Sequence, residues 1–235
     1  LLYGIQIYCD FSGYSDMAIA CAALLGYKFP PNFNSPYLSA NIQDFWRRWH
    51  ISLSSWLRDY LYIPLGGSRR GTMRRDVNLM TTMVLGGLWH GASFNFVIWG
   101  FLHGLALMVE RSWNQIVCTR VPAMGWMGAA LGTAVTFYWV NLAWIFFRAP
   151  TLEESLAMAK TYLIWDSAGT QSLPAITWPL IFGLGLLHIV SHRINLGAII
   201  ANIPANRFAL TTGALGAVAL AFVPLGYRPF IYFQF

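Results

Sequence analysis

Two stretches decide the fold expected of this chain: residues 43–67, QDFWRRWHISLSSWLRDYLYIPLGG, and residues 85–100, LGGLWHGASFNFVIWG. Each places a histidine, His50 in the first and His90 in the second, among residues apolar enough for a membrane. A side chain that can carry a proton is costly in hydrocarbon, so it persists there mainly where it lines a cavity or a reaction path. The two stretches therefore favour a catalytic membrane protein.

The composition of the whole chain agrees with a membrane location. Of the 235 residues, 57% are hydrophobic and 10% are charged, whereas a soluble domain carries about 25% charged residues. The formal net charge of +6 does not indicate a nucleic-acid partner, because the basic residues lie between apolar runs. We interpret the excess positive charge as a sign of membrane topology.

Five apolar segments are predicted to cross or re-enter the membrane as helices, which makes the expected fold an all-α polytopic membrane protein. They are residues 1–27, 79–109, 126–147, 175–190 and 209–225. Polar residues in the first segment indicate a helix with one side facing the protein interior; they are Asp10, Ser12, Ser15 and Asp16. The segment 79–109 exceeds a bilayer core of about 30 Å. We therefore expect either one tilted helix or two helices joined near His90.

Residues 41–64 are too polar for a clean span and too aromatic for a soluble loop. One helical stripe carries Trp46, Trp49, Leu53 and Trp56, and another carries Arg47, His50, Ser54 and Arg58. This pattern predicts an amphipathic helix at the membrane interface or a short re-entrant helix. The loop that follows, GGSRRGTMRR (66–75), contains four arginines and is predicted to be cytoplasmic.

The beginning of the chain and its cysteines limit the domain organisation. The chain opens at Leu1 inside an apolar segment, which suggests the carboxy-terminal part of a longer protein. We expect one membrane-embedded region over 1–235, because no polar stretch is long enough for a separate soluble domain. Cys9, Cys21 and Cys118 form no paired framework, so we expect no disulfide and no redox motif.

The histidines are weighed against ordinary structural roles. His50, on the polar stripe of residues 47–58, could instead simply face headgroups or water. His90 has small neighbours that leave room for a ligand, the alternative being a core histidine bonded to a backbone carbonyl. His103 is roughly 140° from His90 around an ideal helix, so we expect it to pack elsewhere. His188 and His192, in HIVSH, have the spacing of a metal pair on one helix face. The glutamate of H-E-x-x-H and the further histidine boxes of an oxygenase are missing, so we expect an interfacial pair and no metal.

Five motifs, taken in order, carry a resemblance to a known family. They are YCDFSGYSDMAIA (8–20), LLGYKFPPNFNSPY (24–37), FWRRWHISLSSWLRDYLYIPLGG (45–67), LGGLWHGASFNFVIWGFLHG (85–104) and PFIYFQF (229–235). The series resembles the membrane-bound O-acyltransferase family, specifically its alginate O-acetylase branch. The similarity is dense over residues 3–111 and returns at the last residues, and the order of the WRRWH and LWHGA blocks is highly specific.

The resemblance implies a helical bundle in which re-entrant or amphipathic helices surround a tunnel. It implies that His90 matches the essential histidine of the family and His50 the second histidine of the upstream block. Such proteins carry a further amino-terminal half, so we expect this chain to be a part of the enzyme. The tunnel would let a cytoplasmic acyl donor, an acetyl thioester of coenzyme A or of an acyl carrier, meet an acceptor from the other side. No other cofactor is expected.

The partners implied are the lipid bilayer, the acyl donor and the periplasmic acetyl-transfer proteins of a polysaccharide export system, in a bacterial inner membrane crossed several times. We predict acetyl transfer to an exported polysaccharide, alginate first, with His90 as general base and His50 positioning or polarising a reactant. D-alanyl transfer toward teichoic acid and acetylation of peptidoglycan or cellulose are the alternatives. From another class, a transporter with gating histidines stays open, and it would form no covalent bond.

Overall fold

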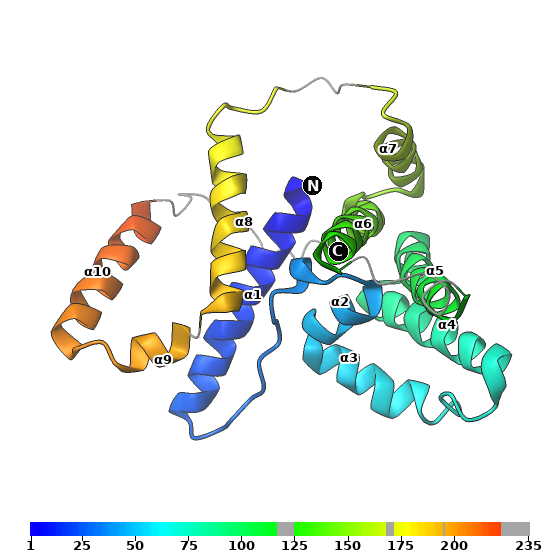
Figure 1. Cartoon of the computed structure of the whole chain (residues 1–235), viewed down its shortest axis with the longest axis horizontal. Coiled ribbons are helices and arrows are strands. Elements are labelled where there is room, and N and C mark those ends of the chain that lie inside the picture. Colours follow the sequence, from blue (N-terminus) through cyan, green and yellow to red (C-terminus); the bar gives the residue numbers. More distant parts are fainter. Residues whose placement is uncertain (117–124, 168–171, 195, 222–235) are drawn as a thin grey trace. The chain divides into compact units, whose positions relative to one another are not determined.

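The computed structural model describes residues 1–116, 125–167, 172–194 and 196–221. Across these ranges every regular element is helical and no strand occurs (Figure 1), which confirms the all-α part of the predicted fold. Backbone contacts divide the chain into two compact units, residues 1–172 and residues 173–234. The first unit contains the elements α1 (Leu2–Leu24), η1 (Pro36–Leu38), α2 (Ile42–Arg48), α3 (Ile51–Leu57), η2 (Arg58–Tyr62), α4 (Gly71–His90), α5 (Phe94–Ile116), α6 (Gly125–Arg148) and α7 (Leu152–Ile164).

The predicted segment 79–109 is divided between two helices, α4 and α5, so the second of the two alternatives is correct. The α4 helix ends at His90, and α5 begins directly after Ser93. The Oγ of Ser93 accepts a hydrogen bond from the Asn95 backbone N–H at 3.2 Å. Serine is a preferred residue at this position because its hydroxyl satisfies a backbone donor that has no partner within the helix. His90 therefore lies at a helix terminus beside a short turn.

Glycines bring α4 and α5 together along their length. A Cβ added at Gly87 would collide with the carbonyl oxygen of Phe96, and one added at Gly100 would collide with the carbonyl oxygen of Met83. Contact of backbone with backbone requires residues without a side chain at both places. The two glycines thus set how near the end of α4 approaches α5.

The predicted single helix over 41–64 is wrong, because the helix is interrupted at its middle. The helices α2 and α3 are separated by Trp49 and His50, and His50 adopts the left-handed conformation with φ 43° and ψ 56°. The interruption rotates α3 relative to the predicted stripe. Of the predicted aromatic stripe, Trp46, Trp49 and Leu53 are buried, but Trp56 is 52% exposed and stacks on Tyr60.

The arginine-rich loop is shorter than predicted. Arg69 and Arg70 lie in the turn before α4, whereas Arg74 and Arg75 already belong to the beginning of that helix. Helix formation satisfies the backbone groups of 71–75, and the arginine side chains still project from the same end of α4. The side on which this end faces is not tested by the structure and stays a prediction.

The α1 helix packs against α6. Its buried residues include Gly4, Ile7, Phe11 and Ser15, which follow one face at helical spacing. The prediction that the polar residues of this segment face the interior holds for Ser15, which is 6% exposed, and is wrong for Asp16, which is exposed. Asp10 and Ser12 are half-buried.

The α6 helix is the one helix in the described ranges that is long and apolar enough to cross a membrane by length and composition. It confirms the helix predicted at 126–147, while its crossing of a membrane, like the other crossings, stays a prediction. The α7 helix follows behind the cap residue Thr151. Tyr138 of α6 and Tyr162 of α7 stack at 4.6 Å, and each hydroxyl donates to the other residue's carbonyl oxygen, at 2.8 and 3.2 Å.

The second unit contains α8 (Thr177–Arg193), α9 (Leu196–Ala201) and α10 (Ala205–Ala221). Helices were predicted at 175–190 and 209–225, and α8 and α10 occupy these positions with shifted ends. Residues 222–225 of the second prediction lie outside the described ranges. Both histidines of HIVSH are on α8.

Candidate functional site

His90 is surrounded by aromatic rings from three helices. Its ring centre is 5.0 Å from that of Trp89 on α4, 5.2 Å from that of Trp99 on α5 and 5.0 Å from that of Phe147 on α6. All three neighbours present an edge-to-face geometry, which is the preferred arrangement for rings. The imidazole is half-buried, so it is desolvated yet reachable.

His50 is held in the interruption between α2 and α3. Its Nδ1 is 3.3 Å from the Oδ1 of Asn32 and 3.3 Å from the Oγ of Ser52, and its ring packs edge-on against Phe11 at 4.7 Å. Asn32 lies in the loop after α1, and the sequence analysis assigned no role to it or to Ser52. Eighteen residues separate Asn32 from His50, so no helical spacing could have linked them.

One aromatic cluster connects the two predicted site histidines. Its members are Phe11, Phe33, Trp46, Trp49, Trp99, Trp144 and Phe147, each in ring contact with another member. His50 packs on one end of the cluster through Phe11, and His90 packs on Phe147 and Trp99.

His103 corrects the sequence analysis. It is fully buried, with its ring centre 4.8 Å from Trp99 and 5.0 Å from Trp46, so it belongs to the surroundings of the same cluster and does not pack elsewhere. The angular estimate treated His90 and His103 as parts of one continuous helix. In the structure the helix ends at His90 and the chain turns into α5, so the angle does not apply. His103 lies on α5, one turn after Trp99, and its ring contacts that of Trp99.

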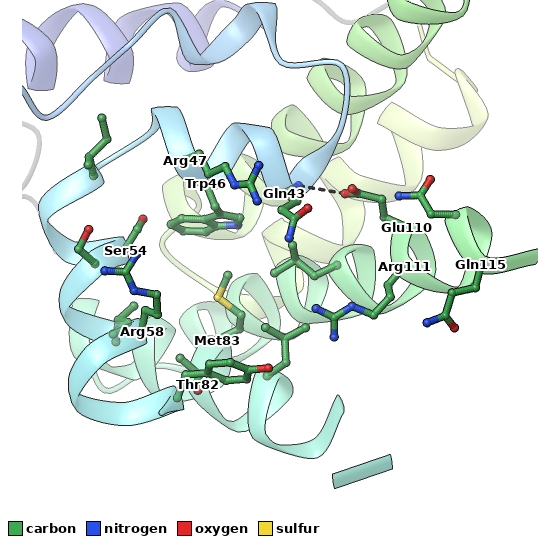
Figure 2. A pocket seen from close by; sticks show the side chains of 17 residues that line it. Gln43, Trp46, Arg47, Ser54, Arg58, Thr82, Met83, Glu110, Arg111 and Gln115 are labelled. Carbon is green, nitrogen blue, oxygen red and sulfur yellow. Dashed lines mark hydrogen bonds between the residues drawn. The ribbon is translucent and has the colours of Figure 1, made fainter. Parts of the chain in front are cut away.

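A pocket of about 560 Å³ opens between α2, α3, η2, α4 and α5. Figure 2 shows Trp46 and Met83 inside it, with Arg47, Arg58 and Arg111 around them. Trp46 also contacts His103 and Trp99. The indole of Trp46 therefore connects the pocket lining to Trp99, a ring that packs against His90.

The charges around the pocket are partly neutralised. Arg58 pairs with Asp59 at 2.7 Å, and Arg111 lies 3.6 Å from Asp76. Glu110 accepts a hydrogen bond from the Gln43 backbone N–H at 2.9 Å. Arg47 is exposed and makes no ion pair with any residue of the described ranges. The guanidinium of Arg47 is thus available to an anionic ligand.

The remaining predicted residues lie apart from these features. His192 is exposed and His188 half-buried on α8, in the second unit. Within the part of the chain that the structure describes, no group of three or more histidines, cysteines and acidic residues is placed to hold a metal ion. Cys9 and Cys21 are free thiols on α1, and Cys118 lies outside the described ranges.

The sequence profile of the membrane-bound O-acyltransferase family matches residues 1–149. The chain belongs to this family. The match includes Asn32, His50, His90, His103 and every residue that lines the pocket. The family is membrane-bound, which agrees with the apolar composition and with the span α6.

Several curated proteins are similar to the chain. It is 46% identical over 185 residues to a probable alginate O-acetylase of Pseudomonas aeruginosa, covering 78% of the chain and 34% of that protein. It is 48% identical over 164 residues to the peptidoglycan O-acetyltransferase of Helicobacter pylori, covering 68% of the chain and 30% of that protein. It is 32% identical over 165 residues to the teichoic acid D-alanyltransferase of Streptococcus thermophilus, covering 62% of the chain and 39% of that protein.

The chain spans about a third of the length of the curated relatives it matches. The resemblance to the family and to its alginate O-acetylase branch is confirmed by these matches. The roles assigned to His50 and His90 stay predictions.

Proposed function

We propose that the full-length protein is an O-acyltransferase of a bacterial inner membrane, which it crosses several times. It takes acetyl groups from a cytoplasmic thioester and passes them across the membrane for the O-acetylation of an exported polysaccharide, alginate first. The position of His90, at the end of α4 where rings of three helices converge, is the observation that carries the proposal. An imidazole so placed is partly shielded from water and still reachable.

The chemistry needs one group that moves a proton. A thioester already has a good leaving group, so the protein has to activate a hydroxyl and keep water away. The hydroxyl oxygen attacks the thioester carbonyl as His90 takes its proton, the new C–O bond forms, and the C–S bond breaks. The thiolate then leaves and receives the proton from His90. His50, on the other side of the aromatic cluster, positions a reactant.

The pocket beside Trp46 is suited to the donor side of this reaction. Thioester donors that carry phosphate groups match arginine, whose planar guanidinium binds phosphate through paired hydrogen bonds. Met83, inside the pocket, is roughly 10 Å along α4 from His90 at 1.5 Å per residue. The middle of α4 lines the pocket, and Arg111 of its lining lies 3.6 Å from Asp76, near the start of that helix. We predict this start, beside the arginines of 69–75, to be cytoplasmic. A donor bound here would point its acyl end toward the aromatic cluster.

A second acceptor has its own support. The peptidoglycan O-acetyltransferase is as similar to the chain as the alginate O-acetylase is, with 48% and 46% identity. The D-alanyltransferase is less similar, with 32% identity. Peptidoglycan acetylation is therefore the alternative to alginate acetylation, and both keep the same transfer chemistry.

The test uses the full-length protein in cells that lack their own enzyme and retain the polysaccharide export system. Inverted membrane vesicles from these cells receive acetyl-labelled coenzyme A, alone or with the acyl carrier proteins of the cell. We expect label to become a base-labile ester on alginate. Ester on peptidoglycan instead would transfer the proposal to the second acceptor. Movement of a labelled solute without any ester would support a transporter and reject the proposal.

A further inference from the structure

The loop after α1 clamps the interruption that contains His50. On one side of that residue, the Asn34 backbone N–H donates to the Arg48 carbonyl oxygen at 2.9 Å. On the other, the Ile51 backbone N–H donates to the Asn32 carbonyl oxygen at 3.0 Å. The left-handed conformation of His50 is therefore fixed from both sides by a segment far away in the sequence. A non-glycine residue in this conformation needs such support.

The side chain of Asn32 then fixes the imidazole itself. Its Oδ1 accepts hydrogen bonds from the Ser52 backbone N–H at 3.2 Å and from the Ser52 hydroxyl at 3.0 Å. Its Nδ2 donates to the Oγ of Ser15, the buried serine of α1, at 3.2 Å. A backbone N–H can only donate, so the amide atom that faces it must be the oxygen. The orientation of the Asn32 amide follows from its partners.

This orientation determines which nitrogen of His50 carries the proton in the neutral ring. Nδ1 faces an amide oxygen, which only accepts, so Nδ1 must be the donor. The Ser52 hydroxyl has given its single proton to Asn32, so it too can only accept from Nδ1. Both neighbours require the same tautomer, and Nε2 is left with its lone pair.

We propose that Asn32 is a positioning residue that holds His50 as the Nδ1–H tautomer, so that His50 accepts a hydrogen bond from a hydroxyl of the sugar acceptor. The inference rests on the proposed function and decides between the two roles open to His50. A ring whose Nε2 is an acceptor orients a hydroxyl, whereas polarising the thioester carbonyl would require a proton on Nε2. Ser15 on α1 and Ser52 on α3 act through Asn32.

Acetyl transfer by four forms of the full-length protein tests the coupling: wild type, Asn32→Ala, His50→Ala and the double variant. We expect Asn32→Ala to lower the turnover about tenfold, the size of one hydrogen bond to a ring that must stay oriented. In the His50→Ala background the same change should have no further effect. Asn32→Asp keeps the acceptor oxygen and should restore most of the turnover. The matched control is Asn34→Ala, an exposed side chain of the same loop.

A purely structural role predicts a different pattern. Losses that multiply in the double variant, or an Asn32→Ala protein that loses membrane level in parallel with turnover while Asn32→Asp does not recover turnover, would overturn the inference. So would a His50→Ala protein with wild-type turnover.

The tautomer can be measured without any turnover. Solid-state nitrogen NMR of protein labelled at histidine should show a His50 signal, identified by its loss in His50→Ala, with a protonated Nδ1 and an unprotonated Nε2. In Asn32→Ala this signal should become a mixture of tautomers. A protonated Nε2 in the wild type would overturn the inference even if acetyl transfer is found. Absence of transfer with the expected tautomer would instead reject the proposed function alone.

Discussion

Replacing Gly87 by alanine tests how closely α4 and α5 must approach to form the site. The added Cβ would collide with the carbonyl oxygen of Phe96, a backbone atom that cannot rotate away. The hairpin has to open, and inserting atoms into a well-packed contact destabilises a protein by about 1–3 kcal/mol. His90 follows three residues later on the same helix, so the ring contact with Trp99 should loosen as well.

The neighbouring glycine supplies a matched control for this change. A Cβ at Gly86 would meet only the Leu57 side chain, with Cδ1 at 3.0 Å and Cδ2 at 3.7 Å, and these atoms are the end of a flexible side chain. Gly185 of α8 has open space around it, so alanine there is neutral or slightly stabilising. We therefore expect the unfolding temperature of Gly87→Ala to be far below that of Gly86→Ala. The unfolding temperature of Gly185→Ala should equal that of the wild type or exceed it.

The first assay is the thermal unfolding of the full-length protein in detergent, monitored by size-exclusion chromatography of heated samples. The second assay is acetyl transfer in membranes. Gly87→Ala should unfold several degrees below the wild type and transfer acetyl groups more slowly. Wild-type unfolding and transfer in Gly87→Ala would refute the packing of the hairpin and the placement of His90 that depends on it.

Three further predictions concern the surroundings of the site. A cysteine at Ser68, beside the arginines of 69–75, should resist an impermeant reagent added to intact cells and react in inverted vesicles, because arginine-rich connections stay in the cytoplasm; labelling from outside would reverse the topology. Arg47→Ala should raise the KM for acetyl-coenzyme A about twofold to fivefold at low salt, as expected for one exposed ionic contact. The KM of Arg47→Lys should lie between those of the wild type and Arg47→Ala, and an unchanged KM in Arg47→Ala would show that the donor does not bind in this pocket. The double variant His188→Gln, His192→Gln should keep acetyl transfer. Loss of transfer together with loss of a stoichiometrically bound metal would contradict the proposed acyltransferase function.

Much of the helical framework could be predicted because it depends on local properties of the chain. The helix α6 is visible from its apolar length alone, and Gly91 and Ser93 mark the turn between α4 and α5. His50 and His90 could be selected because a histidine in an apolar stretch is conspicuous without any structure.

What could not be predicted depends on contacts between distant segments. The interruption at His50 is stabilised by the loop around Asn32, and no helical period connects these positions. His103 was placed wrongly because the angle from His90 was measured along a helix that ends at His90. Asn32 itself lies in a turn rich in proline and asparagine, where a functional side chain resembles any other turn residue.

The central claim, that His90 moves the proton in acetyl transfer, depends on chemistry and so can be separated from packing. The rings of Trp89, Trp99 and Phe147 surround it, so His90→Ala leaves space among them. His90→Gln, with a side chain of comparable length and no basic nitrogen, is therefore the second variant. His192→Ala, an exposed histidine of the second unit, is the control for histidine loss in general.

The decisive measurement is the acetyl ester content of the exported polysaccharide. It is made in cells whose own O-acetyltransferase has been replaced by the full-length wild type or by one of these variants, with equal amounts of protein in the membrane. Loss of a general base lowers the rate about 10²- to 10⁴-fold. We expect both His90 variants to leave the polymer essentially unacetylated and His192→Ala to match the wild type. Near-normal acetylation with His90→Gln would contradict the account and return His90 to a packing role.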